Sequence, residues 1–156
     1  MPMILQIMEG LKVYGLLSAV ERNPEMWRLV FVKEFEPKLT PTALSEEFEA
    51  VYNDSQLIRE KESDVFYHFS TVVDSMEVKL KAFLQWAIGS PSIPPLGLPR
   101  KVKITFLGGC NPACRCRPTA STCDLRVSLP LHLDTFEEMK EILMSALKDS
   151  EGVDLI

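Results

Sequence analysis

Several features are scarce in this sequence, and each scarcity excludes a class of protein. The 156 residues include only two histidines, and 22 acidic against 17 basic side chains give a formal net charge of −5. A chain that is acidic overall is not a nucleic-acid binder, because neutralising phosphates requires a basic surface. No apolar run approaches the roughly 18 residues of a membrane-spanning helix. We therefore expect neither nucleic acid nor a membrane among the partners.

Features of an export signal are also missing from the first eleven residues. They contain Gln6 and Glu9 and lack both a basic start and a small-residue cleavage site. We therefore expect the protein in the cytoplasm or the nucleus, where thiols stay reduced. The cysteines are Cys110, Cys114, Cys116 and Cys123.

Apolar side chains, in contrast, are plentiful. They make up 46% of the residues, and 25% are charged, as in an ordinary globular protein. A chain of this length buries roughly 70% of the surface that it exposes when unfolded. A hydrophobic core therefore forms without help from disulfides or metal.

The first half of the chain has the spacing of helices. Apolar residues recur every three or four positions through residues 4–14, and Pro24 after Asn23 is typical of a helix start. Thr40 and Pro41 repeat that signal. Leu44, Phe48 and Val51 follow on one helical face. The polar stretch 53–62 predicts a loop.

The second half mixes helix and strand. Ser75 predicts the start of a helix that carries an apolar stripe over 80–88 and ends at Gly89. Residues 90–100 hold four prolines, which excludes helix interior and central strand.

Alternating apolar residues then predict two strands, 102–106 and 125–129, the second ended by Pro130. A loop over 108–122 joins them, and a capping box predicts a final helix over 135–147. Helices followed by a small unit of strands and helix indicate an α+β fold.

Cys123 lies where the loop meets the second strand, a position at the rim of a sheet that another macromolecule can reach. Arg115, Arg117 and Arg126 are close in sequence, and cations near a thiol favour the thiolate. Even an unperturbed cysteine is a strong nucleophile at neutral pH. These residues indicate a nucleophilic cysteine.

Other interpretations of the cysteines stay open. A lone cysteine is often a small buried apolar residue. The spacing C-x3-C-x-C-x6-C lacks the paired C-x2-C of strong zinc motifs, although four thiols can bind zinc. A third interpretation is that two of the three residues Cys110, Cys114 and Cys116 form a redox-active pair. We expect His132 to be a polar surface residue rather than a catalytic base.

The motif around Cys123 resembles that of a known family. Residues 118–123 read Pro-Thr-Ala-Ser-Thr-Cys, and a strand ending in Leu129-Pro130 follows. This segment resembles the active-site signature of HECT-type ubiquitin ligases, in which Pro-x-Ala-x-Thr-Cys leads into a strand ending Leu-Pro. Residues 83–90, Phe-Leu-Gln-Trp-Ala-Ile-Gly-Ser, resemble the family's helix and Thr-Gly-Ser turn, with Ile88 in place of Thr.

The resemblance extends over residues 65–156, including the final helix and the Gly-Val-Asp-Leu tail at 152–155. Residues 6–57 resemble, more weakly, the last helices of the family's N-terminal lobe. We therefore assign 1–74 to the end of the N-terminal lobe and 75–156 to the catalytic C-terminal lobe, with a hinge near Asp74 and Ser75.

The resemblance implies a transferase that needs no cofactor. A HECT ligase takes ubiquitin from a charged conjugating enzyme onto its cysteine as a thioester and passes it to a lysine of a protein substrate. Cys123 matches that cysteine, and Thr122 would shape the site. As bases for the lysine we consider Asp154 and Asp124. The alternative is a non-catalytic zinc-binding or protein-interaction module built on the four cysteines.

Two departures from the family bear on activity. The family usually carries Phe at the fourth position from its C-terminus, where it supports transfer to lysine, and Val153 stands there in this sequence. The family's N-terminal lobe, which binds the conjugating enzyme, is much longer than the part that this chain matches. We therefore expect the 156-residue chain to accept ubiquitin from a conjugating enzyme only slowly.

Overall fold

The computed structural model describes residues 2–32, 38–76, 79–94, 97–109, 114 and 116–151. It contains two compact units, Met1–Lys38 and Leu39–Ile156.

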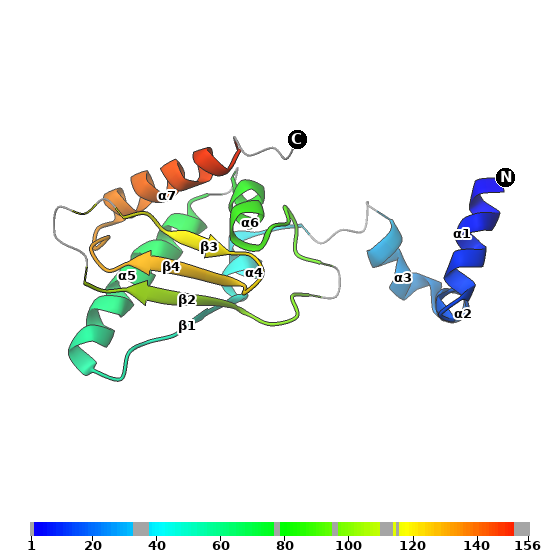
Figure 1. Cartoon of the computed structure of the whole chain (residues 1–156), viewed down its shortest axis with the longest axis horizontal. Helices are drawn as coiled ribbons and strands as arrows, with labels where there is room; N and C mark the ends of the chain where they lie inside the picture. The colour runs from blue at the N-terminus through cyan, green and yellow to red at the C-terminus, as the bar shows by residue number, and fades with distance from the viewer. Residues whose placement is uncertain are drawn as a thin grey trace. The chain divides into compact units, whose positions relative to one another are not determined.

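The first unit consists of three short helices, labelled in Figure 1: α1 (Pro2–Lys12), α2 (Leu16–Arg22) and α3 (Pro24–Phe31). Pro24 occupies the first turn of α3, as the sequence predicts. Among residues 2–32, none whose side chain is described is buried. These helices therefore form no core of their own.

No single helix in the described ranges is long and apolar enough to cross a membrane. Taken together, Met3–Lys12 and Leu16–Arg22 have the length and composition of a span, but a bend of 98° separates them.

The second unit is an α+β domain, which confirms the expected fold class. Its helices are α4 (Pro41–Ser45), α5 (Gln56–Asp74), α6 (Leu80–Ile88) and α7 (Phe136–Glu151). Its strands are β1 (Phe48–Ala50), β2 (Val102–Leu107), β3 (Thr119–Ser121) and β4 (Arg126–Pro130).

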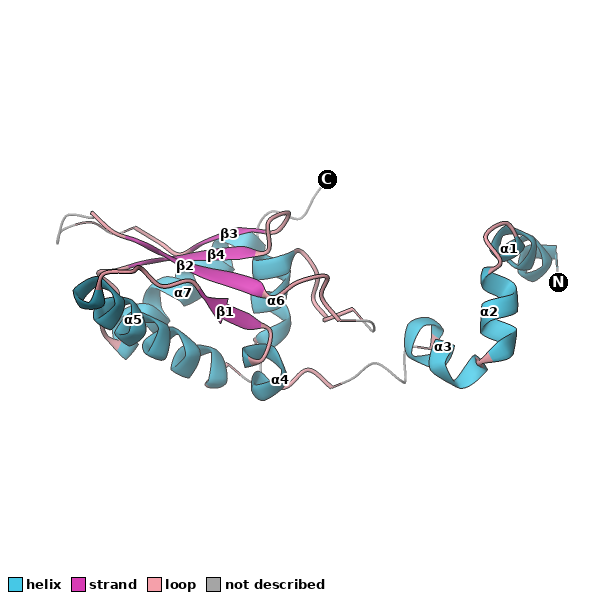
Figure 2. Ribbon diagram, turned by 90° about the horizontal axis from the view of Figure 1, so that it is seen from below, coloured by secondary structure: helices cyan, strands magenta, loops and turns pink. Residues whose placement is uncertain are grey.

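The four strands form one mixed sheet in the order β1-β2-β4-β3. The β1–β2 and β2–β4 pairs are parallel, whereas β3 runs antiparallel to β4. Residues alternate across the sheet: Ile104 and Val127 are buried, and Lys103 and Arg126 are exposed. The buried face lies against the helices, which Figure 2 shows gathered on one side of the sheet.

Aromatic rings join the sheet to the helices. Phe83 of α6 lies 6.0 Å from both Phe48 of β1 and Phe69 of α5, measured between ring centroids. Phe69 and Phe83 are fully buried. Burying each such ring contributes roughly 1.5–3 kcal/mol, so this cluster holds α5, α6 and β1 together.

Several sequence-based expectations are confirmed here. Thr40 caps α4, because its Oγ1 accepts a hydrogen bond from the Ala43 N–H at 3.2 Å. Gly89 ends α6 in the left-handed conformation, with φ 78°. Thr135 Oγ1 accepts from the Glu138 N–H at 3.3 Å, as the capping box requires.

Four expectations were wrong. Ser75 does not start α6, which begins at Leu80, because the Ser75 N–H donates to carbonyls of α5 and Ser75 ends that helix. Residues 53–62 are not all loop, because α5 begins at Gln56 and buries Glu62 and Val65 on the side that faces the core. Phe48 belongs to a strand rather than a helix, because it pairs with the distant Val102. The expected loop before Cys123 contains β3, which the partner strand β4 stabilises.

The boundary between the compact units follows Lys38, and residue 74 lies inside the second unit, at the end of α5. The expected division between the two lobes at residue 74 stays a prediction. Helix α5 supplies part of the core of the second unit. Its buried apolar residues are Val65, Phe69, Val72 and Val73.

Candidate active site

Cys123 lies at the tip of a tight turn that connects β3 to β4. The turn covers residues 122–125, and it is closed by the Asp124 N–H, which donates to the Ser121 carbonyl at 3.2 Å. The Cys123 thiol is exposed and free. Because paired strands fix both ends of the turn, the sulfur is presented to solvent from a defined position.

Leu125 anchors this turn to the domain. The sequence predicts that Leu125 begins the strand, but it is the last residue of the turn and has φ 43°. A bulky side chain rarely adopts this conformation. Leu125 is only 8% exposed, and its carbonyl accepts a hydrogen bond from the Lys103 N–H at 2.8 Å. Burial and this hydrogen bond offset the backbone strain and hold Cys123 outward.

Thr122 lies against the end of α6. A methyl group placed on Gly89 would lie 3.5 Å from Cβ and Cγ2 of Thr122. The helix end and the turn are therefore in close approach, and glycine suits both the left-handed φ and the limited space. The role expected for Thr122 in shaping the site stays a prediction.

A shallow groove of about 480 Å³ opens beside Cys123. Its walls are mostly apolar and come from the end of α6, the proline-containing segment that follows, and the turn itself. They consist of Ile88, Ser90, Pro94, Leu98, Pro99, Arg100, Thr122, Cys123 and Leu125. The groove can receive an extended chain segment whose end reaches the sulfur.

Two arginines hold Asp124, the residue after Cys123. Nη2 of Arg100 lies 3.1 Å from Oδ1 of Asp124, and Arg126 forms an ion pair with Oδ2. Sequence analysis pointed to Arg126 but missed Arg100, because Arg100 and Asp124 are 24 positions apart in the chain. Of the other expected cations, Arg117 is exposed, and Arg115 lies outside the described residues.

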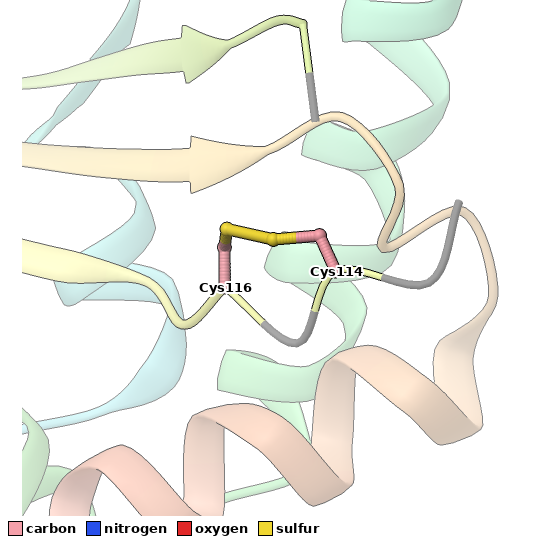
Figure 3. Close-up of a disulfide and its surroundings, with 2 residues drawn as sticks. All are labelled: Cys114 and Cys116. Carbon is pink, nitrogen blue, oxygen red and sulfur yellow. A yellow bond between two sulfur atoms is a disulfide. The ribbon is translucent and has the colours of Figure 1, made fainter. Parts of the chain in front are cut away.

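Cys114 and Cys116 are joined in a disulfide, shown in Figure 3. The expectation that all four cysteines are reduced is therefore wrong for this pair, because one intervening residue brings the two sulfurs within bonding reach. Cys110 lies outside the described residues. Within the described ranges, no three His, Cys, Asp or Glu side chains are placed to hold a metal ion. The sulfur atoms of Cys114 and Cys116 are therefore bonded to each other and are not free thiols in this structure.

Asp154, the other base considered from the sequence, lies outside the described residues, as does Val153. The structure therefore brings together Thr122, Cys123 and Asp124 at one turn. It adds Gly89 and Arg100, which no local sequence signal connects to them.

Comparison with known proteins gives the family. No curated protein matches the chain closely enough to serve as a relative. The family model described as HECT-domain (ubiquitin-transferase) matches residues 33–156, which is most of the chain and includes the Cys123 turn. The chain therefore belongs to the HECT-domain family of ubiquitin transferases.

Proposed function

We propose that Cys123 accepts ubiquitin as a thioester from a charged conjugating enzyme and passes it to a lysine of a protein substrate. The observation that carries this proposal is the state of its sulfur, which is free, exposed and held at the tip of a turn beside a groove. The motif Pro-x-Ala-x-Thr-Cys, which resembles the family's signature, ends at this residue.

In the first step the Cys123 thiolate attacks the thioester carbon at the C-terminus of ubiquitin. The new C–S bond replaces the bond to the conjugating enzyme, whose cysteine leaves as a thiolate. One thioester replaces another, so the step is close to thermoneutral. Thiols are partly ionised at neutral pH, and the reaction therefore needs no dedicated base.

In the second step the amine of a substrate lysine attacks the same carbon. An amide forms, Cys123 leaves as a thiolate, and the nitrogen loses a proton. The amide is more stable than the thioester, which drives the transfer forward. We assign the proton to Asp154, because both carboxylate oxygens of Asp124 are already engaged by Arg100 and Arg126.

The groove and the ion pairs then have distinct roles. The apolar walls provided by Ile88, Leu98 and Leu125 receive the extended end of ubiquitin. Asp124 fixes the turn through its arginines, so that Cys123 meets the carbonyl carbon in a constant orientation.

A direct test mixes the chain with a ubiquitin-charged conjugating enzyme and follows adducts on non-reducing gels. The intact chain should form a ubiquitin adduct that thiol removes, whereas Cys123→Ser should form a thiol-resistant ester or none. Cys114→Ser serves as a matched control and should keep the thiol-sensitive adduct. A thiol-sensitive adduct that persists in Cys123→Ser would exclude the proposal.

A further inference from the structure

One face of the sheet in the second unit is not covered by helices. Figure 2 shows the helices of that unit gathered on the other side. Parallel strands are normally buried on both faces, and the β1–β2 and β2–β4 pairs are parallel. The side chains of the uncovered face therefore decide what can lie against it.

Two cations lie side by side on this face. Lys103 of β2 is directly opposite Arg126 of β4, and both are exposed. Like charges in this position destabilise a sheet. Ser121 of β3, opposite Arg126, continues the row with a hydroxyl. A negatively charged partner would offset the repulsion between the two cations.

Further cations lie at the amino end of β2. Arg100 and Lys101 immediately precede that strand and are exposed. Arg100 and Arg126 share the carboxylate of Asp124. Lys101 and Lys103 form no ion pair with any residue that the structure describes. This end of β2 and β4 therefore has an excess of positive charge, although the whole chain has a net charge of −5.

The cations are close to Cys123. Arg126 follows Cys123 by three positions, so their Cα atoms are at most about 11 Å apart. The Lys103 N–H donates to the Leu125 carbonyl at 2.8 Å, which places Lys103 beside the same turn. In an extended segment, side chains on one face recur about every 6.6 Å. An extended segment with one side chain at the Cys123 sulfur can therefore place another, two or three residues away, over Lys103 and Arg126.

We propose that Arg100, Lys101, Lys103 and Arg126, the cationic strip, select protein substrates in which Asp or Glu stands two or three residues from the acceptor lysine. The inference rests on the proposed function, because that lysine attacks the ubiquitin thioester at Cys123. The substrate carboxylate binds to the strip without reacting. Its ion pairs hold the lysine amine near the thioester carbon, which raises the rate of transfer.

Carboxylates on the other side of β2 adjust this selection. Glu49 of β1 is exposed and lies directly opposite Lys103, and Glu47 precedes the same strand. The Glu49 carboxylate offsets part of the charge of Lys103 and repels an acidic segment. Removal of the Glu49 charge should therefore strengthen the preference for acidic substrates, whereas removal of the Lys103 charge should weaken it.

The first test does not involve ubiquitin. It uses the full chain with Cys110→Ser, in which Cys123 is the free thiol. Three extended peptides carry cysteine in place of the acceptor lysine, joined in a disulfide to the same chromogenic aromatic thiol. They differ only in having Glu, Gln or Lys two residues away. Cys123 attacks the peptide sulfur and the aromatic thiolate leaves, so its absorbance gives the rate.

Each initial rate is divided by that peptide's rate with a small uncharged thiol, and Cys123→Ser gives the background. The Glu peptide should react about two- to fivefold faster than the Gln peptide, the size of an exposed ion pair, and the Lys peptide should be the slowest. The net charge of the chain alone would favour the Lys peptide. Equal rates, or the reverse order, would overturn the proposal.

Charge variants locate the effect on the sheet. Lys103→Gln should reduce the preference for the Glu peptide about twofold, and Glu49→Gln should raise it by a similar factor. Lys61→Gln is the matched control, because it removes an exposed lysine from α5 on the helical side, and it should change nothing. In about 1 M salt the preference should disappear, since charges are then screened within ~3 Å. Equal effects of Lys103→Gln and Lys61→Gln, or a lower preference in Glu49→Gln, would exclude the cationic strip.

The second test uses the chain isolated as its ubiquitin thioester and the corresponding peptides with lysine in place of cysteine. Transfer to the Glu-flanked lysine should be about two- to fivefold faster than transfer to the Gln-flanked lysine, and Lys103→Gln should reduce the difference. Equal transfer to all three peptides would overturn the assigned substrate class. Failure of Cys123 to form the thioester would instead overturn the proposed function, while the disulfide peptides still decide whether the strip binds acidic segments.

Discussion

The two cysteine-containing segments of the second unit are close in sequence but present sulfur in different states. Cys123 is a free, exposed thiol at the tip of a turn whose ends are fixed by paired strands. Cys114 and Cys116 are half-buried and oxidised, in the segment between β2 and β3. The difference shows that the chemistry of a cysteine depends on its spatial neighbours and on the distance to the next thiol.

The largest expected effect comes from the core beneath the Cys123 turn. Phe83 is fully buried on α6, the helix whose end approaches Thr122. Phe83→Ala should lower the free energy of unfolding of the second unit by about 3–5 kcal/mol, because it leaves a cavity. Urea denaturation measures this loss.

A matched control for that substitution is Phe31→Ala in the first unit. Phe31 is 56% exposed, so its loss should change the free energy of unfolding by less than about 0.5 kcal/mol. A cost below about 1 kcal/mol for Phe83→Ala would show that the core does not support the turn as described.

Loss of the Cys114–Cys116 disulfide should lower the free energy of unfolding by less than Phe83→Ala does. Cys116→Ser opens a very short loop, for which the chain-entropy relation gives about 1.5 kcal/mol. Thermal unfolding under oxidising conditions measures it, and Cys114→Ser should give the same value because it removes the same bond. A loss of more than about 3 kcal/mol would make the bond a structural element of the kind found in disulfide-dependent domains.

Local sequence patterns were enough to predict much of this domain. The stripe of α6, the strand over β2 and the capping box before α7 all depend on residues near one another in the chain. The motif ending at Cys123 is local as well. Each of these could therefore be identified from the amino-acid sequence alone.

Features that depend on distant pairing could not be predicted. Gln56–Asp74 has many polar residues on its solvent side, which concealed a helix whose buried face includes Phe69. Strand β1 is only three residues long and exists because Phe48 pairs with Val102. The contact of Arg100 with Asp124 has the same non-local origin.

Gly89 and Gly109 offer a finer test of the Cys123 turn. Both adopt a positive φ, 78° and 79°, but of the two only Gly89 has another described residue near the position of an added methyl group, namely Thr122. Each substitution by alanine should cost about 1 kcal/mol through backbone strain. Only Gly89→Ala should alter the alkylation rate of Cys123. Equal alkylation rates of Cys123 in the two variants would show that the contact of Gly89 with Thr122 does not shape the site.

The smallest expected effect concerns the ion pairs at the turn. Asp124 and its arginines are each between 42% and 50% exposed, so Asp124→Asn should cost less than about 1 kcal/mol. The loss should diminish at high salt, because exposed pairs are screened. Unfolding measured at low and high salt checks this, and a salt-independent loss would contradict the ion-pair explanation.

The central claim is that Cys123 alone is the acceptor of ubiquitin. The most direct measurement treats the chain with ubiquitin that carries a thiol-reactive group at its C-terminus, in the presence and absence of a reductant that opens Cys114–Cys116. Peptide mass mapping then locates the bond. The account predicts one ubiquitin per chain, attached at Cys123 under both conditions and absent from Cys123→Ala. Attachment at Cys110, Cys114 or Cys116 in place of Cys123 would contradict it.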